Sequence, residues 1–161
     1  MKIAGSIYLS ALNDSSIRQE IVHNEPLVAV LPKSHALHKR PTISLEMLAA
    51  EPFLLYPARP RPSYADEVLA LFERNGLKAR VVQEVNEMQT ALGLVAAGIG
   101  VTLVPTSVQK MRQGDVVYKS LNDPKIVSPI VMSYRDGDQS STLALFTKRV
   151  RLLSKISGSR D

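Results

Sequence analysis

Apolar residues recur along this chain with two alternating spacings, one typical of strands and one typical of helices. Residues 18–31 are rich in Ile, Val and Leu around Asn24-Glu25-Pro26, which predicts a long extended segment broken or bulged at the proline. Further strands are predicted at residues 53–56, 79–85, 101–104, 116–121 and 129–134. The alternation of these strands with helical patterns favours an α/β fold around a mostly parallel sheet.

Four helices are predicted from apolar residues at helical spacing. A short one follows Ser44, a second runs from about Ala65 to Asn75-Gly76, and a third begins near Met88. The last helix has Asp138 or Ser140 as its cap. Its predicted buried stripe consists of Leu143, Phe146, Val150 and Leu153.

Composition and charge exclude several classes of protein. The chain has 161 residues, of which 45% are hydrophobic and 22% charged, as in ordinary globular proteins. Its apolar runs are far shorter than the roughly 20 residues of a membrane-spanning helix, and the N-terminus is a poor secretory signal. These features predict a cytoplasmic protein without membrane association. The absence of cysteine excludes disulfides and a thiolate zinc site.

The net charge of +5 is concentrated at the C-terminus. Residues 148–161 hold five basic residues and one acid, so the rest of the chain is nearly neutral. A solvated basic helix end explains this distribution better than nucleic-acid contact does.

Enzyme motifs are missing from the sequence. It contains no phosphate-binding loop, no zinc-protease helix and no nucleophile elbow. Gly98-Ile99-Gly100 follows a helix and precedes a strand, which indicates a helix C-cap rather than a dinucleotide site. His35 and His38 share a polar loop and predict no metal site. Glu84 and Glu87 are candidates for acid–base chemistry, although a helix start explains Glu87 as well. No cofactor is predicted.

The segment Arg59-Pro60-Arg61-Pro62-Ser63-Tyr64 is the strongest candidate for a binding site. It follows a predicted strand, where ligands of α/β proteins usually bind. Backbone N–H groups at the start of the next helix predict an anion site, to which Arg61 adds a charge-assisted hydrogen bond and Tyr64 a flat wall with a hydroxyl. An equally good interpretation is that Ser63 only caps the helix and the prolines only enforce a turn.

Three blocks of sequence resemble the effector-binding domain of LysR-type transcriptional regulators. The blocks are residues 25–37, residues 51–53 and residues 91–105, and the resemblance extends over residues 13–153. Within the family, residues 55–57, 61–66 and 89–94 are similar to the branch that responds to muconates or chloromuconates and controls catechol and benzoate degradation.

The resemblance implies a periplasmic-binding-protein-like fold of type 2, with two α/β lobes and an effector between them. Residues 1–12 do not match the family. Residues 13–29 then correspond to a crossing strand and a remnant of the first lobe, residues 30–127 to a complete Rossmann-like second lobe, and residues 128–161 to the returning strand and the C-terminal helix of the partial first lobe. The family's winged helix-turn-helix does not occur in these 161 residues, so DNA contact is expected only through that absent N-terminal domain.

The function implied is ligand sensing by a regulator of aromatic-compound catabolism. Arg61, Pro62, Ser63 and Tyr64 match the family's loop that holds one carboxylate of a dicarboxylate such as cis,cis-muconate, and Ile130 matches a wall residue. A homo-oligomer is expected, and no enzyme activity. A solute-binding protein for a small carboxylate is the first alternative, and a small α/β enzyme acting through Glu84 or Glu87 is the second.

Overall fold

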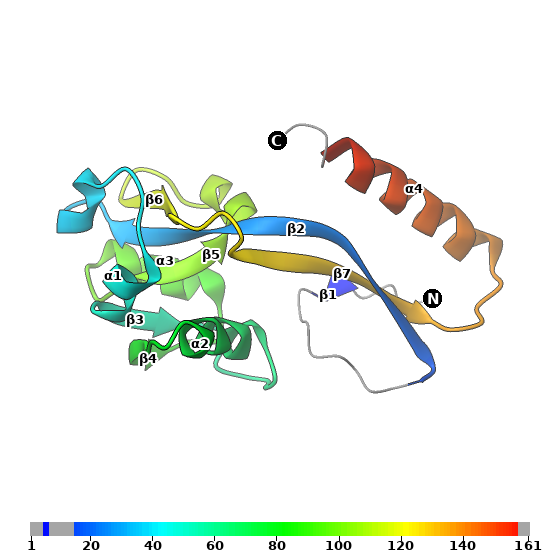
Figure 1. The fold of residues 1–161 in the computed structure, drawn as a ribbon, viewed down its shortest axis with the longest axis horizontal. Coiled ribbons are helices and arrows are strands. Elements are labelled where there is room, and N and C mark those ends of the chain that lie inside the picture. Colours follow the sequence, from blue (N-terminus) through cyan, green and yellow to red (C-terminus); the bar gives the residue numbers. More distant parts are fainter. Residues whose placement is uncertain (1–4, 7–14, 158–161) are drawn as a thin grey trace. The chain divides into compact units, whose positions relative to one another are not determined.

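The computed structural model describes residues 5–6 and 15–157, and the chain divides into two compact units (Figure 1). The first unit takes the described residues up to Asn24 and those from Pro129 onward, and the second spans Glu25–Ser128. The second unit contains the whole of the lobe predicted at residues 30–127.

The second unit is built on one half of a long strand. This strand, β2 (Ile17–Pro32), pairs antiparallel with β5 (Thr102–Pro105) on one side and with β6 (Val116–Ser120) on the other. Strands β3 (Pro52–Leu55) and β4 (Arg80–Glu84) pair with each other in parallel. A parallel bridge between Phe53 and Val101 joins β3 to the start of β5.

Helices and short turns connect these strands. The helices are α1 (Leu45–Ala49), α2 (Tyr64–Arg74) and α3 (Met88–Ala96). Two 3-10 helices, η1 (Ala36–Lys39) and η2 (Thr106–Lys110), follow β2 and β5. As predicted, Gly98 follows the C-cap of α3 with a positive φ of 78°, and Ile99 N–H donates to Leu94 O over 3.0 Å.

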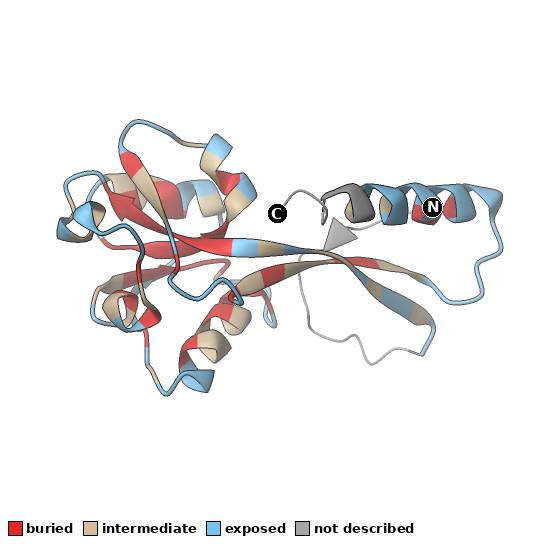
Figure 2. Cartoon of the chain, turned by 45° about the horizontal axis from the view of Figure 1, so that its top comes forward, coloured by how far each residue is buried: buried red, intermediate tan, exposed pale blue. Residues whose placement is uncertain are grey.

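The core of the second unit lies among its strands and the inner faces of its helices, as the buried residues in Figure 2 show. Phe53 of β3 and Phe72 of α2 are each 1% exposed and meet edge to face, with ring centroids 5.4 Å apart. This contact anchors α2 on β3. The segment between the two elements is therefore held at both ends.

The first unit contains β1 (Gly5–Ser6), the first part of β2, most of β7 (Val127–Arg135) and α4 (Ser141–Ser157). Ser140 caps α4, because its Oγ accepts a hydrogen bond of 3.3 Å from Leu143 N–H. Of the predicted stripe, Leu143 is buried, whereas Phe146 and Leu153 are 37% and 62% exposed. The predicted buried stripe is therefore buried at Leu143 but not at Phe146 or Leu153, because α4 buries only a narrow face, with Thr147 beside Leu143.

Two further predictions need correction. The prediction of a mostly parallel sheet was wrong, since β1–β7, β2–β5 and β2–β6 are all antiparallel pairs. The order of elements along the chain does not determine the direction in which a strand enters a sheet.

The break predicted at Asn24-Glu25-Pro26 was also wrong, because β2 continues through it. Pro26 loses only its N–H donor, and its carbonyl still accepts a hydrogen bond from Thr106 Oγ1 over 2.8 Å.

No helix in the described part of the chain is long and apolar enough to cross a membrane.

Candidate functional site

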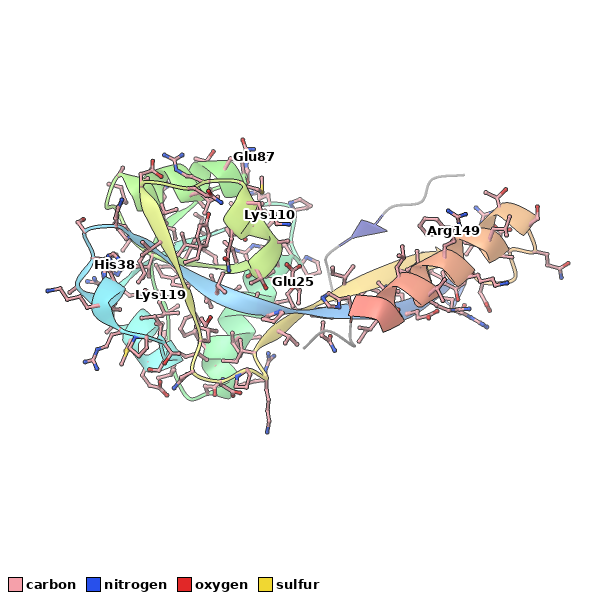
Figure 3. All side chains as sticks on the ribbon, turned by 90° about the horizontal axis from the view of Figure 1, so that it is seen from above. Glu25, His38, Glu87, Lys110, Lys119 and Arg149 are labelled. Atoms are coloured by element: carbon pink, nitrogen blue, oxygen red, sulfur yellow. The ribbon has the colours of Figure 1, made fainter. Side chains whose placement is uncertain are left out.

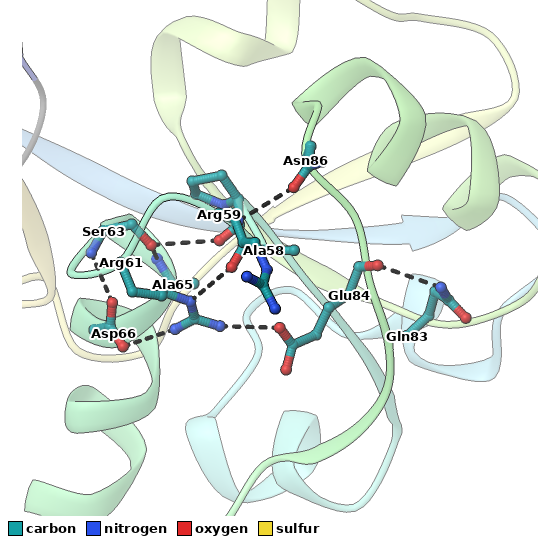
Figure 4. A network of polar contacts seen from close by, with 10 residues as sticks. Ala58, Arg59, Arg61, Ser63, Ala65, Asp66, Gln83, Glu84 and Asn86 are labelled. Carbon is teal, nitrogen blue, oxygen red and sulfur yellow. Dashed lines mark hydrogen bonds and ion pairs between the residues drawn. The ribbon is translucent and has the colours of Figure 1, made fainter.

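The segment from Tyr56 to Ser63 connects β3 to α2 and lies at the carboxyl end of β3 (Figure 4). Three of its peptide bonds are cis, those before Pro57, Pro60 and Pro62. Two backbone hydrogen bonds connect its start to the strand end beside it, from Ala58 N–H to Val85 O (2.8 Å) and from Val85 N–H to Leu55 O (3.0 Å). Arg59 N–H also donates to Asn86 Oδ1 over 3.2 Å.

Ser63 begins α2 through a capping box. Its Oγ accepts a hydrogen bond from Ala65 N–H (3.3 Å), and its own N–H donates to Asp66 Oδ2 (2.6 Å). Its hydroxyl also donates to Pro57 O over 3.3 Å. The capping interpretation of Ser63 is therefore confirmed. Free N–H groups were predicted near Ser63, Tyr64 and Ala65, and this was wrong for Ser63 and Ala65, because the capping box uses both.

Arg61 joins the segment to α2 and to β4. Its guanidinium donates to Asp66 Oδ1 over 2.7 Å, to Glu84 Oε2 over 3.1 Å and, through Nε, to Ala58 O over 3.1 Å (Figure 4). The Arg61 side chain is 30% exposed, and Asp66 and Glu84 are 44% and 48% exposed. This half-exposed network orients the guanidinium while leaving it in contact with solvent.

The guanidinium of Arg61 has N–H donors that no residue of the segment uses. A guanidinium has five N–H donors, of which the three contacts above use one each. Two N–H groups therefore remain for an incoming acceptor. The local charge is less favourable for binding an anion, because Asp66 and Glu84 offset the positive charges of Arg61 and Arg59. A ligand carboxylate must therefore compete with these two acids for Arg61.

Tyr64 is buried, with 6% exposure, and packs against Tyr56 with ring centroids 5.3 Å apart. Its hydroxyl donates to Leu103 O over 3.2 Å, so the prediction of an available hydroxyl was wrong. Burial raises the pKa of Tyr64 well above its ordinary value, and the phenol stays neutral. Tyr64 therefore supports the segment from Tyr56 to Ser63 through the packing of its ring.

The remaining predicted residues lie elsewhere. Ile130 is half-buried in β7, within the first unit. Glu87 is the N-cap residue of α3, as predicted. His35 caps η1 and approaches Glu51 Oε2 at 3.4 Å, and among the described residues no group of three or more acidic or histidine side chains is arranged to hold a metal ion.

The sequence interpretation did not predict that Asp66 and Glu84 contact Arg61, and it considered Glu84 only as a candidate for acid–base chemistry. The spacing Ser63-x-x-Asp66 is the signature of a capping box and was a usable signal for Asp66. Glu84 comes from β4, and its meeting with Arg61 depends on the parallel pairing of β3 with β4, which no local pattern reveals.

A family model described as the LysR substrate binding domain matches residues 5–152. The chain belongs to this family. The predicted family is thereby confirmed, and the family is one of regulator domains rather than enzymes. A cytoplasmic location is the one expected for such a domain.

Curated relatives are transcriptional regulators. The chain is 55% identical over 129 residues to the HTH-type transcriptional regulator CatR of Pseudomonas putida, covering 80% of this chain and 44% of CatR. It is 34% identical over 149 residues to the regulator BenM of Acinetobacter baylyi, covering 91% of this chain and 49% of BenM. The chain thus spans about half the length of the curated relatives it matches.

Solved structures agree with the family. The BenM effector-binding domain with its effector benzoate superposes with a TM-score of 0.85 at 32% identity, covering 93% of this chain and 68% of that one. CbnR, a LysR family transcriptional regulator, superposes with a TM-score of 0.78 at 30% identity, covering 86% of this chain and 48% of CbnR. These two likenesses confirm the predicted periplasmic-binding-protein-like α/β fold.

Proposed function

We propose that this chain is the ligand-sensing part of a regulator of aromatic-compound catabolism, and that its effector is a small dicarboxylate such as cis,cis-muconate. Membership in the LysR substrate-binding family supports the sensing role and disfavours the solute-binding alternative. A related domain, that of BenM, has benzoate as its effector, and benzoate is also a planar carboxylate. DNA contact then belongs to a winged helix-turn-helix domain outside these 161 residues, and a homo-oligomer is expected.

The observation that carries the proposal is the oriented guanidinium of Arg61. Three contacts hold it in place, two of its N–H groups remain for a ligand, and it is partly exposed. One carboxylate of the effector accepts these donors in a charge-assisted pair. Pro62, Ser63 and Tyr64 shape the segment around it, with Ser63 and Tyr64 already engaged in supporting contacts.

Asp66 and Glu84 keep the affinity of this half-site modest, because a ligand must share Arg61 with them. The second carboxylate is proposed to bind the part of the first lobe that the resemblance places outside this chain. In this proposal residues 30–127 are the second lobe, and Ile130, from the returning strand, is a wall residue of the effector site. A ligand that binds one lobe arrangement better than another shifts the equilibrium between them.

The test is an NMR titration of the isotopically labelled chain with cis,cis-muconate, which detects weak binding. Saturable shifts are expected at the side-chain N–H groups of Arg61 and at the backbone amides of Tyr64 and Ala65. Arg61→Met is expected to abolish them. Arg74→Met is the matched control, because Arg74 is an exposed arginine at the end of the same helix.

Two results would contradict the proposal. If Arg61→Met leaves the shifts and their midpoint unchanged, the assigned residue is wrong. If benzoate or succinate shifts these resonances at concentrations where muconate does nothing, a muconate-like effector is wrong.

A further inference from the structure

A hollow lies beside β6 in the second unit. It has a volume of about 390 Å³ and is lined by residues of η1, of η2 and the turn after it, and of β6, namely His38, Gln109, Gln113, Gly114, Val116, Val117, Tyr118 and Lys119. Strand β6 pairs with β2 on the side of β2 opposite to β5. The Arg61 segment instead contacts β4, whose partner is β3. The hollow is therefore separate from the proposed effector site.

The polar side chains around this hollow are largely uncommitted. Within the described part of the chain, no hydrogen bond or ion pair engages the side chains of Gln109, Gln113 and Lys119. His38 donates from Nδ1 to Lys33 O over 2.9 Å, which leaves its Nε2 for other partners. Figure 3 shows His38 and Lys119 on the same side of the second unit.

The charge around the hollow is one-sided. The two segments that supply its lining, residues 33–40 and 106–120, contain six lysines and arginines but a single acid, Asp115. Arg112 neutralises that acid through two hydrogen bonds, of 3.0 and 2.5 Å. The hydroxyl of Tyr118 is also used, since it donates to Arg112 O over 2.9 Å. No carboxylate lines the hollow itself.

We propose that this hollow is a second binding site, for a small oxyanion that carries a carboxylate or phosphate group. Lys119 supplies the charge, the amides of Gln109 and Gln113 supply N–H donors, and the ring of Tyr118 with Val116 and Val117 supplies apolar wall. A volume of this size lies within the range of small-molecule sites. The basic surroundings raise the local concentration of anions.

The site opens to solvent, so the bound anion keeps part of its hydration. The retained hydration favours a modest affinity, and it favours selection of ligands by their charge rather than by their shape. A metal cation is disfavoured because the lining lacks carboxylates, and a long polymer is disfavoured because the uncommitted groups surround a hollow rather than follow a ridge.

The experiment is an amide NMR titration of the full chain with inorganic phosphate and, separately, with succinate, each against sodium chloride at equal ionic strength. Saturable shifts are expected in residues 113–119 and in the side-chain amides of Gln109 and Gln113 with either anion, and not with chloride. Lys119→Met is expected to weaken binding roughly two- to fivefold, the effect of one partly exposed charge pair. Lys78→Met is the matched control, because Lys78 is exposed and lies beside β4, away from the hollow.

Three results overturn the proposal. The first is an equal midpoint of the phosphate titration for Lys119→Met and Lys78→Met, and the second is a set of shifts that grow equally with chloride. The third is a stronger and salt-sensitive shift of the same residues with a short DNA duplex, which would assign the surface to nucleic acid. Since Arg61 lies outside the hollow, the Arg61→Met substitution must leave the midpoint of the phosphate titration unchanged. The two proposed sites can therefore fail independently.

Discussion

A single added methyl group is expected to have opposite effects at two glycines of the second unit. At Gly100, which is buried between α3 and β5, an ideal Cβ would lie 2.5 Å from Pro52 O and 3.2 Å from Leu54 Cγ. At Gly93, inside α3, the nearest atom would be Arg112 Nη1 at 3.9 Å, which is ordinary contact. Gly100→Ala must therefore displace backbone, whereas Gly93→Ala fits.

The expected changes in the free energy of unfolding follow from these distances. Pro52 O also accepts the hydrogen bond from Val101 N–H, 2.8 Å long, that connects β3 to β5. Overpacking of this kind costs roughly 1–3 kcal/mol, and weakening the hydrogen bond adds about 0.5–1.5 kcal/mol. Gly93→Ala is expected to stabilise the chain by about 0.5–1 kcal/mol, because alanine loses less backbone entropy in a helix.

The assay is urea unfolding followed by far-ultraviolet circular dichroism. The midpoint is expected to fall for Gly100→Ala and to rise for Gly93→Ala, with unchanged slopes. If Gly100→Ala alone is too unstable to purify, the same substitution is compared within the Gly93→Ala background. A Gly100→Ala chain as stable as the parent would refute the close approach of Gly100 to Pro52 and the reasoning built on it.

Three other substitutions test the site and the first unit. Glu84→Gln removes an acid that competes for Arg61 and is expected to tighten muconate binding about two- to fivefold in the same NMR titration; weaker binding would show that Glu84 positions Arg61 rather than competes for it. Ser63→Ala is expected to lower the free energy of unfolding by about 1–2 kcal/mol in urea, through loss of the helix cap, whereas Ser63→Thr keeps the hydroxyl and loses less. The hydrogen bond from Arg151 holds the pKa of Glu20 below its ordinary value of 4.5, so this pair stabilises the fold above that value and the contribution is lost as the pH falls through the lowered pKa. Glu20→Gln is therefore expected to lower thermal stability at neutral pH and to match the parent in strong acid, and an equal deficit at both pH values would contradict this assignment.

Much of the local structure was predictable, because it depends on neighbours in sequence. The strands at residues 53–56 and 116–121 and the glycine that follows the C-cap of α3 lie where apolar spacing and glycine chemistry place them. The direction of the strands was not predictable in this way. Strand β2 takes antiparallel partners from two distant parts of the chain, and hydrophobic period carries no information about direction.

The candidate site shows the same division. Ser63 was predictable as a cap because its partners Ala65 and Asp66 are within three residues. The commitment of Arg61 to Glu84 was not, since 23 residues separate them. Tyr64 failed as an exposed hydroxyl because its acceptor, Leu103 O, comes from β5. Long-range contacts therefore decide which polar groups of a local motif remain available to a ligand.

The ends of the second unit meet within the fold. Leu27 N–H donates to Ile126 O over 3.1 Å, so the segment Glu25–Ser128 leaves and re-enters the rest of the chain at neighbouring points. A segment of this kind behaves as an insert, which can be excised or circularly permuted with little loss of chain connectivity. Joining residues 25 and 128 through a short linker, with new termini in an exposed turn such as that at Gly76, gives a direct route to a stand-alone form of the second unit.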